Sequence, residues 1–293
     1  MAILIVGGSS GLGAQLAWLY ALDDKEVYAT CRRKTPPAEF TDGRKPLENI
    51  HWVTEIDRLN AYVGEHLVQS IVHQVEDMSP SATSVHLFDT VIITAPYSAP
   101  EDPVVSEADN ELELELDHDN DRISWAKQHI MYTTAAVAPV FIINELVDAK
   151  MLAPGAKVVL VSSEAGSLTL RHPSEGRGNY SHHASKAALN MVGRMLSQEL
   201  KEQGYIVVIA HPGFKRRTMA RDSGGAERPR EDLGGHVTPT LAAATLIEWT
   251  KGLTMEHSGQ FWAPRGNRDI ETWQAVMGSS DDGITDKPIQ LPW

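Results

Sequence analysis

A glycine-rich segment near the N-terminus has the residue types and spacing that bind phosphate groups. It reads Val6-Gly7-Gly8-Ser9-Ser10-Gly11-Leu12-Gly13 and lies between an apolar run and a segment with helical spacing. Glycines let a phosphate approach the backbone, and the N-terminus of the following helix offers free N–H groups and the positive end of its dipole. This position after a strand and before a helix predicts a dinucleotide site. Its residues would be Gly7, Ser9, Ser10, Gly11, Leu12 and Gly13.

Two arginines, Arg32 and Arg33, directly follow the second apolar run, Val27 to Thr30. In dinucleotide-binding folds the end of this strand lies beside the adenosine ribose, where an acidic residue suits a free 2′-hydroxyl and a basic residue suits a 2′-phosphate. Guanidinium groups bind phosphate through paired N–H donors, which favours NADP(H) over NAD(H). A solvated turn is the alternative for these arginines. Asp57, after the third apolar run, is expected either to contact the adenine edge or to cap the next helix.

The elements that must position these residues alternate between strands and helices. Strands are expected at Ile3–Val6, Val27–Thr30, His51–Val53, Phe88–Ile93, Ala156–Val161, Tyr205–Ala210 and Gln260–Trp262, and helices at Ala14–Ala21, Leu59–Val75, Ile123–Val147, Ala184–Lys201 and Leu241–Leu253. Alternation with near-continuous apolar strands predicts an α/β fold: a doubly wound, Rossmann-type parallel sheet with helices on both faces and its ligand at the carboxyl ends of the strands.

We expect one domain over residues 1–293, because no linker rich in Pro, Gly or Ser divides it. Residues 214–240 are expected to form a loop over the site, and residues 263–293 a tail that wraps the domain or a partner. Within the acidic segment 101–121, the alternating stretch Glu111–Leu116 fits either an edge strand or a helix start.

Composition excludes several classes of function. The formal net charge of −13 opposes binding to a phosphate backbone, so no nucleic-acid partner is expected. No apolar run is expected to reach the ~18 to 20 residues that cross a bilayer, so no membrane span is expected either. The lone Cys31 cannot form an internal disulfide, and a strand-like run begins at Ile3 with no basic leader before it, which predicts a cytoplasmic protein. His172, His183 and His211 lack metal-ligand spacing, so no metal site is expected.

From about residue 2 to residue 262 the chain resembles the short-chain dehydrogenase/reductase family. The Gly-x-x-x-Gly-x-Gly turn, Val-Ser-Ser before Gly166, Ala-Ser-Lys-Ala-Ala at 184–188 and Pro212-Gly213 occur in the family order. The expected fourth-strand Asn-Asn-Ala-Gly reads Ile-Thr-Ala-Pro here and keeps only Ala95. The resemblance implies that Ala95, Lys186, Pro212 and Gly213 contact the cofactor. It also implies a homodimer or homotetramer through helix 184–201 and the strand near Phe261.

In such enzymes a serine holds the substrate carbonyl, a tyrosine passes the proton, and a lysine lowers the pKa of the tyrosine and binds the nicotinamide ribose. The resemblance gives the first and last roles to Ser163 and Lys186, but the tyrosine position, four residues before the lysine, holds His182. Four residues are ~400° of helix rotation, so His182 and Lys186 share a face. Tyr180, six residues before Lys186, is about a third of a turn away. A supporting asparagine would fall near Ala135.

Three kinds of chemistry follow. His182 acts as the general acid for hydride transfer, since an imidazole pKa of ~6.5 suits proton donation, although Lys186 would lower it. Alternatively, Tyr180 takes the proton role. In the third case the chain is a non-redox isomerase, dehydratase or cyclase, with His182 as the base and Ser163 as a hydrogen-bond donor. The sequence favours an NADP(H)-dependent oxidoreductase acting on a carbonyl or alcohol of a small hydrophobic molecule. Residues 215–217, Lys-Arg-Arg, would meet phosphates or an acidic substrate group, or form an exposed loop.

Overall fold

A computed structural model describes residues 2–38, 43–78, 88–94, 125–175, 178–213, 219–221, 227–229, 237–270, 272–278 and 284–293. Ala95, the acidic segment 101–121, residues 215–217 and most of the expected loop 214–240 therefore lie outside the described residues.

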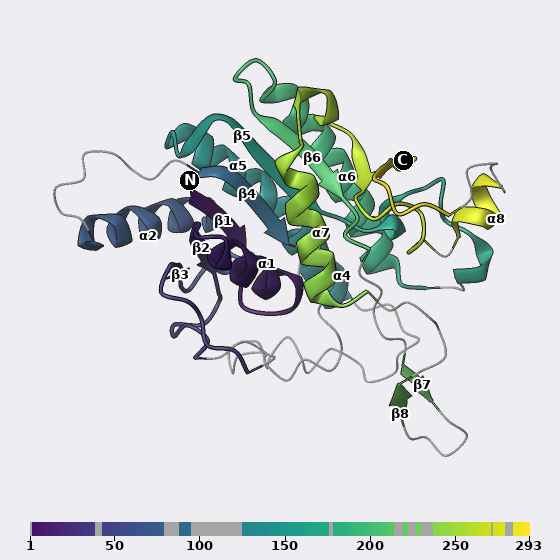
Figure 1. Cartoon of the computed structure of the whole chain (residues 1–293), viewed down its shortest axis with the longest axis horizontal. Helices are drawn as coiled ribbons and strands as arrows, with labels where there is room; N and C mark the ends of the chain where they lie inside the picture. The colour runs from purple at the N-terminus through teal and green to yellow at the C-terminus, as the bar shows by residue number, and fades with distance from the viewer. Residues whose placement is uncertain are drawn as a thin grey trace.

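Eight strands form the sheet that carries the site (Figure 1). They are β1 (Ala2–Val6), β2 (Glu26–Thr30), β3 (Ile50–Val53), β4 (Phe88–Thr94), β5 (Leu152–Val161), β6 (Ile206–Ala210), β9 (Phe261–Ala263) and β10 (Ile289–Gln290). Their order is β10-β9-β6-β5-β4-β1-β2-β3, and every pair is parallel except β10 with β9. The order reverses between β1 and β4, which is where doubly wound sheets bind ligands. The predicted Rossmann-type α/β fold is confirmed.

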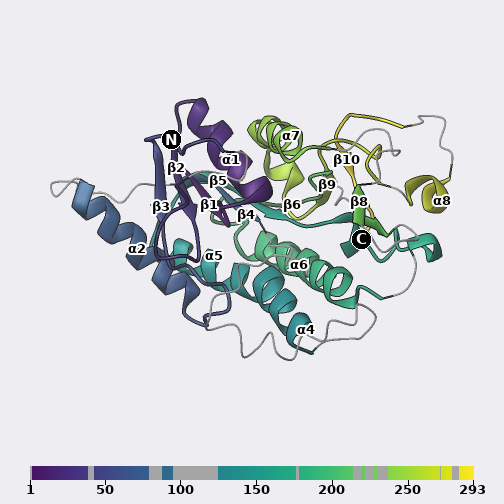
Figure 2. The ribbon, with the colours of Figure 1, turned by 90° about the horizontal axis from the view of Figure 1, so that it is seen from below.

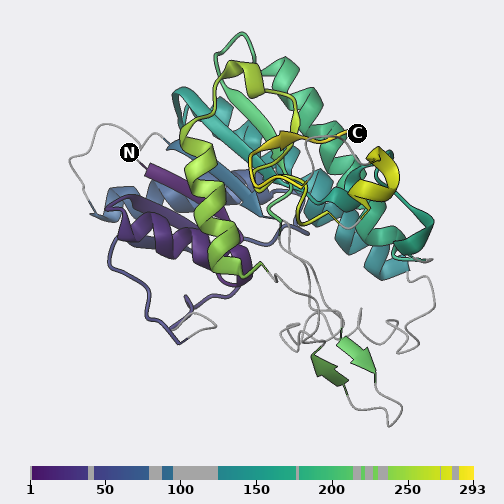
Figure 3. The same ribbon diagram turned by 45° about the vertical axis from the view of Figure 1, so that its right-hand side comes forward.

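Helices cover both faces of this sheet (Figure 2). The helices α1 (Gly11–Leu22) and α7 (Pro239–Lys251) lie on one face, and α2 (Val63–Met78), α4 (Trp125–Tyr132), α5 (Ala138–Asp148) and α6 (Tyr180–Glu199) lie on the other. The short helix α8 (Trp273–Met277) and the two-stranded pair β7 (Met219–Arg221) and β8 (Glu227–Pro229) lie apart from the sheet (Figure 3).

Alternate residues of each central strand face the two helix layers. Leu4 and Val158 belong to the apolar cluster with α2 and α5, whereas Ile5 and Val159 belong to the cluster with α1 and α7. Since successive side chains of a strand point to opposite faces, a strand covered on both sides needs apolar residues throughout. This explains the near-continuous apolar runs in the sequence.

The long helix predicted at Ile123–Val147 is interrupted. A π-helical turn at Thr133–Val137 separates α4 from α5, and Pro139 lies at the start of α5. Proline has no N–H to donate to the carbonyl four residues earlier, here that of Ala135, so the regular α-helical ladder cannot continue through this point. Ala135, where the resemblance places an asparagine, lies within the π turn.

Within the segment Trp125–Asp148, 24 residues long, an 18-residue window has a mean hydropathy of 1.6, which by length and composition would suffice for a bilayer-crossing helix. The expectation that no apolar run is this long was therefore wrong for this segment. The segment packs against the sheet, α2 and α6, and half of this window is buried, as in the core helix of an α/β fold.

Two helix starts differ from the sequence prediction. Helix α6 begins at Tyr180, four residues earlier than expected, after Asn179 in a left-handed conformation with φ 55°. Helix α2 begins at Val63 rather than Leu59. The intervening residues form turns because the carboxylate of Asp57 accepts a hydrogen bond from the N–H of Leu59 at 3.0 Å. Asp57 therefore does not cap α2.

The tail after β9 wraps the domain itself. β10 pairs with β9, and Leu291 is buried beside Phe261. The hydroxyl of Ser167 donates to the Pro292 carbonyl at 2.8 Å, and the N–H of Thr169 donates to a Trp293 oxygen at 2.9 Å. The tail thus holds the segment that follows β5, where the candidate catalytic residues begin.

Candidate cofactor and active site

The glycine-rich turn, residues 7–13, joins β1 to α1 at the carboxyl edge of the sheet. Gly7 has φ 90° and Gly11 has φ 53°, a left-handed region that favours glycine. A Cβ on Gly13 would lie 1.9 Å from the Gly7 carbonyl oxygen, so only glycine lets α1 start this close to β1. Ser10 is extended, and within the described chain its side chain caps none of the first helical N–H groups. These groups are therefore available to an anion.

Thr30 and Thr94 anchor the turn from both sides. The hydroxyl of Thr30 accepts a hydrogen bond from the N–H of Gly7 at 2.8 Å. The hydroxyl of Thr94 lies 2.9 Å from the Val6 carbonyl and 3.1 Å from the Gly7 carbonyl. Thr94 stands where the resemblance expected the asparagine pair, and its contacts join the end of β4 to the turn. Ala95, the next residue, lies outside the described residues.

Arg58 lies at this edge, although the sequence did not single it out as a site residue. One of its guanidinium nitrogens, Nη1, donates a hydrogen bond to the Thr94 carbonyl, and its Nη2 would lie 3.4 Å from a Cβ on Gly7. Burial first, and then the like charge of Arg32, lower the pKa of Arg58 to about 10, while Asp57 acts in the opposite direction. Arg32 and Arg33 are exposed at the end of β2. The sequence does hold a signal for this role of Arg58, because Arg58 directly follows Asp57, a predicted cofactor-binding residue after the third strand.

Ser163 lies at the carboxyl end of β5 and begins the short 3-10 helix Glu164–Gly166. Its hydroxyl accepts from the N–H of Ala165 at 3.2 Å and donates to the carboxylate of Glu164 at 3.0 Å. That same carboxylate oxygen lies 2.9 Å from Nδ1 of His211, which is 2% exposed. The sequence pattern predicts no role for Glu164, and it predicts only that His211 is not a metal ligand.

The carboxyl group of Glu164 is held ionised. Burial alone would raise its pKa, but the charge of His211 and the hydrogen bonds from His211 and Ser163 lower the pKa to about 2. Ser163 therefore directs its only hydroxyl hydrogen at a carboxylate, while its oxygen accepts the N–H of Ala165.

Helix α6 packs directly against the turn that carries Ser163. The hydroxyl of Ser162 donates to the side-chain oxygen of Asn190 at 2.6 Å, and the amide nitrogen of Asn190 donates to the Gly166 carbonyl at 3.2 Å. A Cβ on Gly166 would lie 2.8 Å from the Lys186 carbonyl carbon, so glycine permits this close approach. The packing places Lys186 at the end of β5.

Lys186 is buried, and its amine donates a hydrogen bond to the Val161 carbonyl at 2.9 Å, two residues before Ser163. Burial first, and then the positive charge of Arg58, lower the pKa of Lys186 to about 7. The structure thus brings Ser163 and Lys186 to one end of β5. Arg58 lies close enough for its charge to lower the pKa of Lys186.

His182 and Tyr180 occupy different parts of the first turns of α6. His182 is half-buried one helical turn before Lys186, and its ring lies 5.9 Å from that of His183 in a T-shaped arrangement. Tyr180 is the first residue of the helix and is 57% exposed. Because Tyr180 is helical, its direction stays about a third of a turn from that of Lys186.

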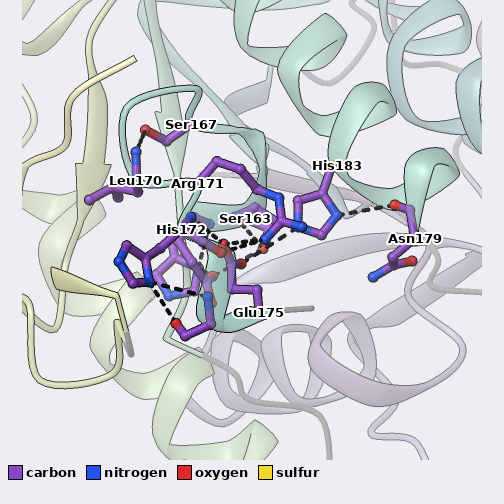
Figure 4. Close-up of polar contacts among 12 residues, drawn as sticks. Ser163, Ser167, Leu170, Arg171, His172, Glu175, Asn179 and His183 are labelled. Atoms are coloured by element: carbon purple, nitrogen blue, oxygen red, sulfur yellow. Dashed lines mark hydrogen bonds and ion pairs between the residues drawn. The ribbon is translucent and has the colours of Figure 1, made fainter. Parts of the chain in front are cut away.

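His183 connects α6 to the segment between β5 and α6 (Figure 4). The carboxylate of Glu175 lies 2.7 Å from the Arg171 guanidinium and 3.6 Å from Nε2 of His183. The ring Nδ1 of His183 lies 3.1 Å from the Asn179 carbonyl. His183 therefore belongs to a cluster that holds residues 171–175 against the start of α6.

Pro212 and Gly213 follow β6 at the same edge of the sheet. Gly213 has φ 74°, and a Cβ there would lie 2.6 Å from the Asp269 carboxylate, which pairs with Arg265 at 2.7 Å. The tail, through Arg265 and Asp269, thus packs against this turn. Among the described residues, His, Cys, Asp and Glu side chains form no group of three that could hold a metal ion.

Comparison with known proteins gives several relatives named as oxidoreductases or dehydrogenases, and one named C-signal, of Myxococcus xanthus. No family model matches the chain. It is 38% identical over 111 residues to 1-hydroxy-2-glutathionyl-2-methyl-3-butene dehydrogenase of Rhodococcus sp., a match that covers 38% of the chain and 45% of that protein. It is 24% identical to an uncharacterised oxidoreductase of Saccharomyces cerevisiae over 91% of the chain and 96% of the relative.

Solved structures share the fold over 89% to 100% of the chain. The NADPH-bound carbonyl reductase from chicken fatty liver superposes with a TM-score of 0.62 at 19% identity and covers 90% of the chain and 91% of its own. A carbonyl reductase from Pseudomonas aeruginosa in complex with NADP has a TM-score of 0.60 at 21% identity, and the match covers 100% of this chain and 99% of the reductase. A short-chain dehydrogenase/reductase of Serratia marcescens has a TM-score of 0.58 at 14% identity, and the match covers 89% of this chain and 94% of that protein. The chain has the Rossmann-type fold of these proteins.

Proposed function

We propose that this chain is an oxidoreductase of the short-chain dehydrogenase/reductase family that uses NADP(H) and acts on a carbonyl or alcohol of a small hydrophobic molecule. One observation carries the proposal: the glycine-rich turn, Ser163 and Lys186 lie along a single carboxyl edge of the sheet, at the ends of β1 and β5. The oxidoreductase names of the relatives and the carbonyl reductase structures support it.

The residues of this edge fit a dinucleotide. A Cβ on Gly11 would meet no atom of the described residues within 4 Å, so none of these residues blocks the approach of a pyrophosphate to the first turn of α1. Arg32 and Arg33 are exposed at the end of β2, where a 2′-phosphate would lie. Lys186 would hold the nicotinamide ribose, and the turn at Pro212 and Gly213 would border the nicotinamide. The resemblance of the chain to the NADPH-bound and NADP-bound reductases favours NADP(H).

The bound cofactor would supply a hydride to the carbonyl carbon. Ser163 would position the substrate oxygen, and His182 would donate the proton that this oxygen takes up, so that a carbonyl becomes an alcohol. His182 is the better proton donor on geometric grounds, since it lies on the Lys186 face of α6, whereas Tyr180 is exposed and about a third of a turn away. The charged form of Lys186 would bind ribose hydroxyls.

Kinetics of purified full-length protein tests this function. NADPH and NADH consumption would be followed with a panel of aromatic and aliphatic ketones and aldehydes, and His182→Phe would be compared with Tyr180→Phe. We expect NADPH to be preferred, His182→Phe to lower turnover at least tenfold, and Tyr180→Phe to leave it within about twofold. Equal turnover of both variants and the parent chain would show that neither residue is the proton donor.

A second candidate is a non-redox isomerase, dehydratase or cyclase with a retained cofactor. The observation that favours it is the imidazole of His182, half-buried at the position four residues before Lys186, because a neutral imidazole can accept a proton as a base. Following product formation and the absorbance of reduced nicotinamide in one reaction separates the two candidates. Conversion without net change in the cofactor would establish the non-redox reaction.

We also infer a homodimer or homotetramer in a cytoplasmic setting. Supporting an oligomer, four large apolar side chains on α5, α6 and the π turn are exposed on one helix layer: Val137, Phe141, Met191 and Met195. Light scattering of the purified protein tests the oligomeric state, and Met191→Glu combined with Met195→Glu should shift it to monomer.

A further inference from the structure

Arg58 crosses the edge of the sheet that the dinucleotide would occupy. It follows β3, yet its guanidinium reaches the Thr94 carbonyl at the end of β4, and β2 and β1 stand between these strands. The segment before it runs along the end of β2, where the N–H of Ile56 donates to the Cys31 carbonyl at 3.0 Å. The guanidinium thus arrives beside Gly7, at the glycine-rich turn.

Three cationic groups are gathered along this edge. Arg32 lies close enough to lower the pKa of Arg58, and Arg58 lies close enough to lower the pKa of Lys186. We call Arg32, Arg58 and Lys186 the cationic row. Asp57 is the carboxylate that acts on Arg58, and it already accepts a hydrogen bond from Leu59. Like charges held together at a partly buried edge are stabilised when an anion binds among them.

Within the described residues, the guanidinium of Arg58 keeps N–H donors that such an anion could accept. Arginine carries five N–H donors in a planar fork, and the structure shows Nη1 engaged with the Thr94 carbonyl while Nη2 faces the glycine-rich turn. The N–H groups at the start of α1 open onto the same turn. A phosphate at this point would receive hydrogen bonds from a helix N-terminus and a guanidinium together.

We propose that Arg58 binds the pyrophosphate of the dinucleotide, opposite the N-terminus of α1, and is therefore an anchor shared by NADP(H) and NAD(H). This inference rests on the proposed function. The arginines then have separate roles, because Arg58 contacts the phosphates common to both cofactors, whereas Arg32 and Arg33 contact the 2′-phosphate that only NADP(H) carries. Arg58 also ties β4 to the turn through Thr94, in place of the asparagine pair that the family resemblance led us to expect.

Isothermal titration calorimetry with NADP⁺ and with NAD⁺ tests these separate roles on the full-length chain. Arg58→Gln should weaken the binding of both cofactors by a similar factor, about 10- to 100-fold, as expected for the loss of a charged hydrogen-bonding pair. Arg32→Gln should weaken NADP⁺ alone. Arg58→Lys keeps the charge without the fork and should fall between Arg58→Gln and the parent chain.

A matched control separates binding from folding. Arg194 also donates from Nη1 to a backbone carbonyl, that of Gly259 at 3.2 Å, but at the opposite end of the sheet. Arg194→Gln should therefore leave both affinities within about twofold, and thermal melting shows which variants are folded. If Arg58→Gln unfolds the protein, the comparison of Arg58→Lys with the parent carries the test.

The outcomes distinguish this inference from the function on which it rests. If the parent chain binds neither NADP⁺ nor NAD⁺, the proposed function is wrong. If the parent binds a cofactor and folded Arg58→Gln binds it equally well, the proposed function stands and the role of Arg58 is wrong. A loss of NADP⁺ affinity alone in Arg58→Gln would overturn the pyrophosphate assignment and move Arg58 to the 2′-phosphate.

Discussion

The hydroxyl of Ser163 donates a hydrogen bond to the Glu164 carboxylate at 3.0 Å, and the same carboxylate oxygen lies 2.9 Å from Nδ1 of His211. A serine that would hold a substrate carbonyl is thereby joined to a fixed negative charge. The carboxylate side chain is 27% exposed, so the contact lies partly shielded from water at the carboxyl edge of the sheet. Any substrate oxygen that approaches Ser163 must compete with Glu164 for its hydrogen.

The Glu164 carboxylate should make folding sensitive to acid. Its pKa in the folded protein is about 2, below the usual 4.5, so its stabilising contribution is complete above pH 4.5 and is lost as the pH falls toward 2. Glu164→Gln should lower the free energy of unfolding by about 1–3 kcal/mol at pH 7 and by less at pH 3. Urea titrations at both pH values measure this difference. Glu202→Gln, on the exposed surface, is the control; an equal effect of both changes would contradict the prediction.

The affinity for NADP⁺ should fall as the pH rises above 7. The pKa of Lys186 is lowered to about 7, so its amine is charged below this pH and neutral above it, and an anionic cofactor favours the charged form. Above this pH the amine of Lys186 must take up a proton when NADP⁺ binds, so the affinity for NADP⁺ falls by up to about tenfold per pH unit. Calorimetry from pH 6 to pH 9 measures the slope.

Two variants assign this pH dependence. Lys186→Met should bind NADP⁺ more weakly and remove the step near pH 7. Lys157→Met should keep the step, since the amine of Lys157 donates to the Thr250 and Lys251 carbonyls at the other end of the sheet. Persistence of the step in Lys186→Met would identify another titrating group, with His182 the first to examine.

Two glycines of the same turn should respond differently to alanine. A Cβ on Gly13 would lie 1.9 Å from the Gly7 carbonyl oxygen, so Gly13→Ala must displace α1 from β1. A Cβ on Gly11 would meet no described atom within 4 Å. Gly11→Ala would therefore cost only the strain of holding alanine in the left-handed conformation, about 1–2 kcal/mol. We expect Gly13→Ala to destabilise the protein by more than about 3 kcal/mol and abolish cofactor binding. Chemical denaturation compares the two; similar losses would argue against a packing role for Gly13.

Removing the hydroxyl of Thr94 should loosen the turn. Thr94 is buried, and its hydroxyl contacts the Val6 and Gly7 carbonyls. Thr94→Val keeps the shape and should cost about 1–2 kcal/mol and weaken NADP⁺ binding severalfold, because the turn loses its tie to β4. The control is Thr245→Val, whose hydroxyl bonds the Leu241 carbonyl within α7. An unchanged affinity in folded Thr94→Val would show that the turn holds its shape without this contact.

Much of the site was predictable because it depends on local order along the chain. The glycine-rich turn needs only a strand before it and a helix after it, and both follow from apolar spacing. The boundaries were less predictable where side chains compete with helix formation. Asp57 bonds the N–H of Leu59 and delays α2, Asn179 adopts a left-handed conformation and starts α6 at Tyr180, and Pro139 removes a helical hydrogen bond near Ala135.

By itself the sequence determined the alternation of strands and helices and the glycine-rich turn. It also determined where Ser163, His182 and Lys186 lie along the chain, because all of these are properties of spacing within a segment. Only the tertiary structure decided which residues from distant segments meet. Arg58 reaches Thr94, Glu164 meets His211, and Lys186 bonds Val161, contacts that span between 25 and 47 positions of the chain. Sheet order and helix packing create such contacts, and a single strand or helix carries no record of its neighbours in space.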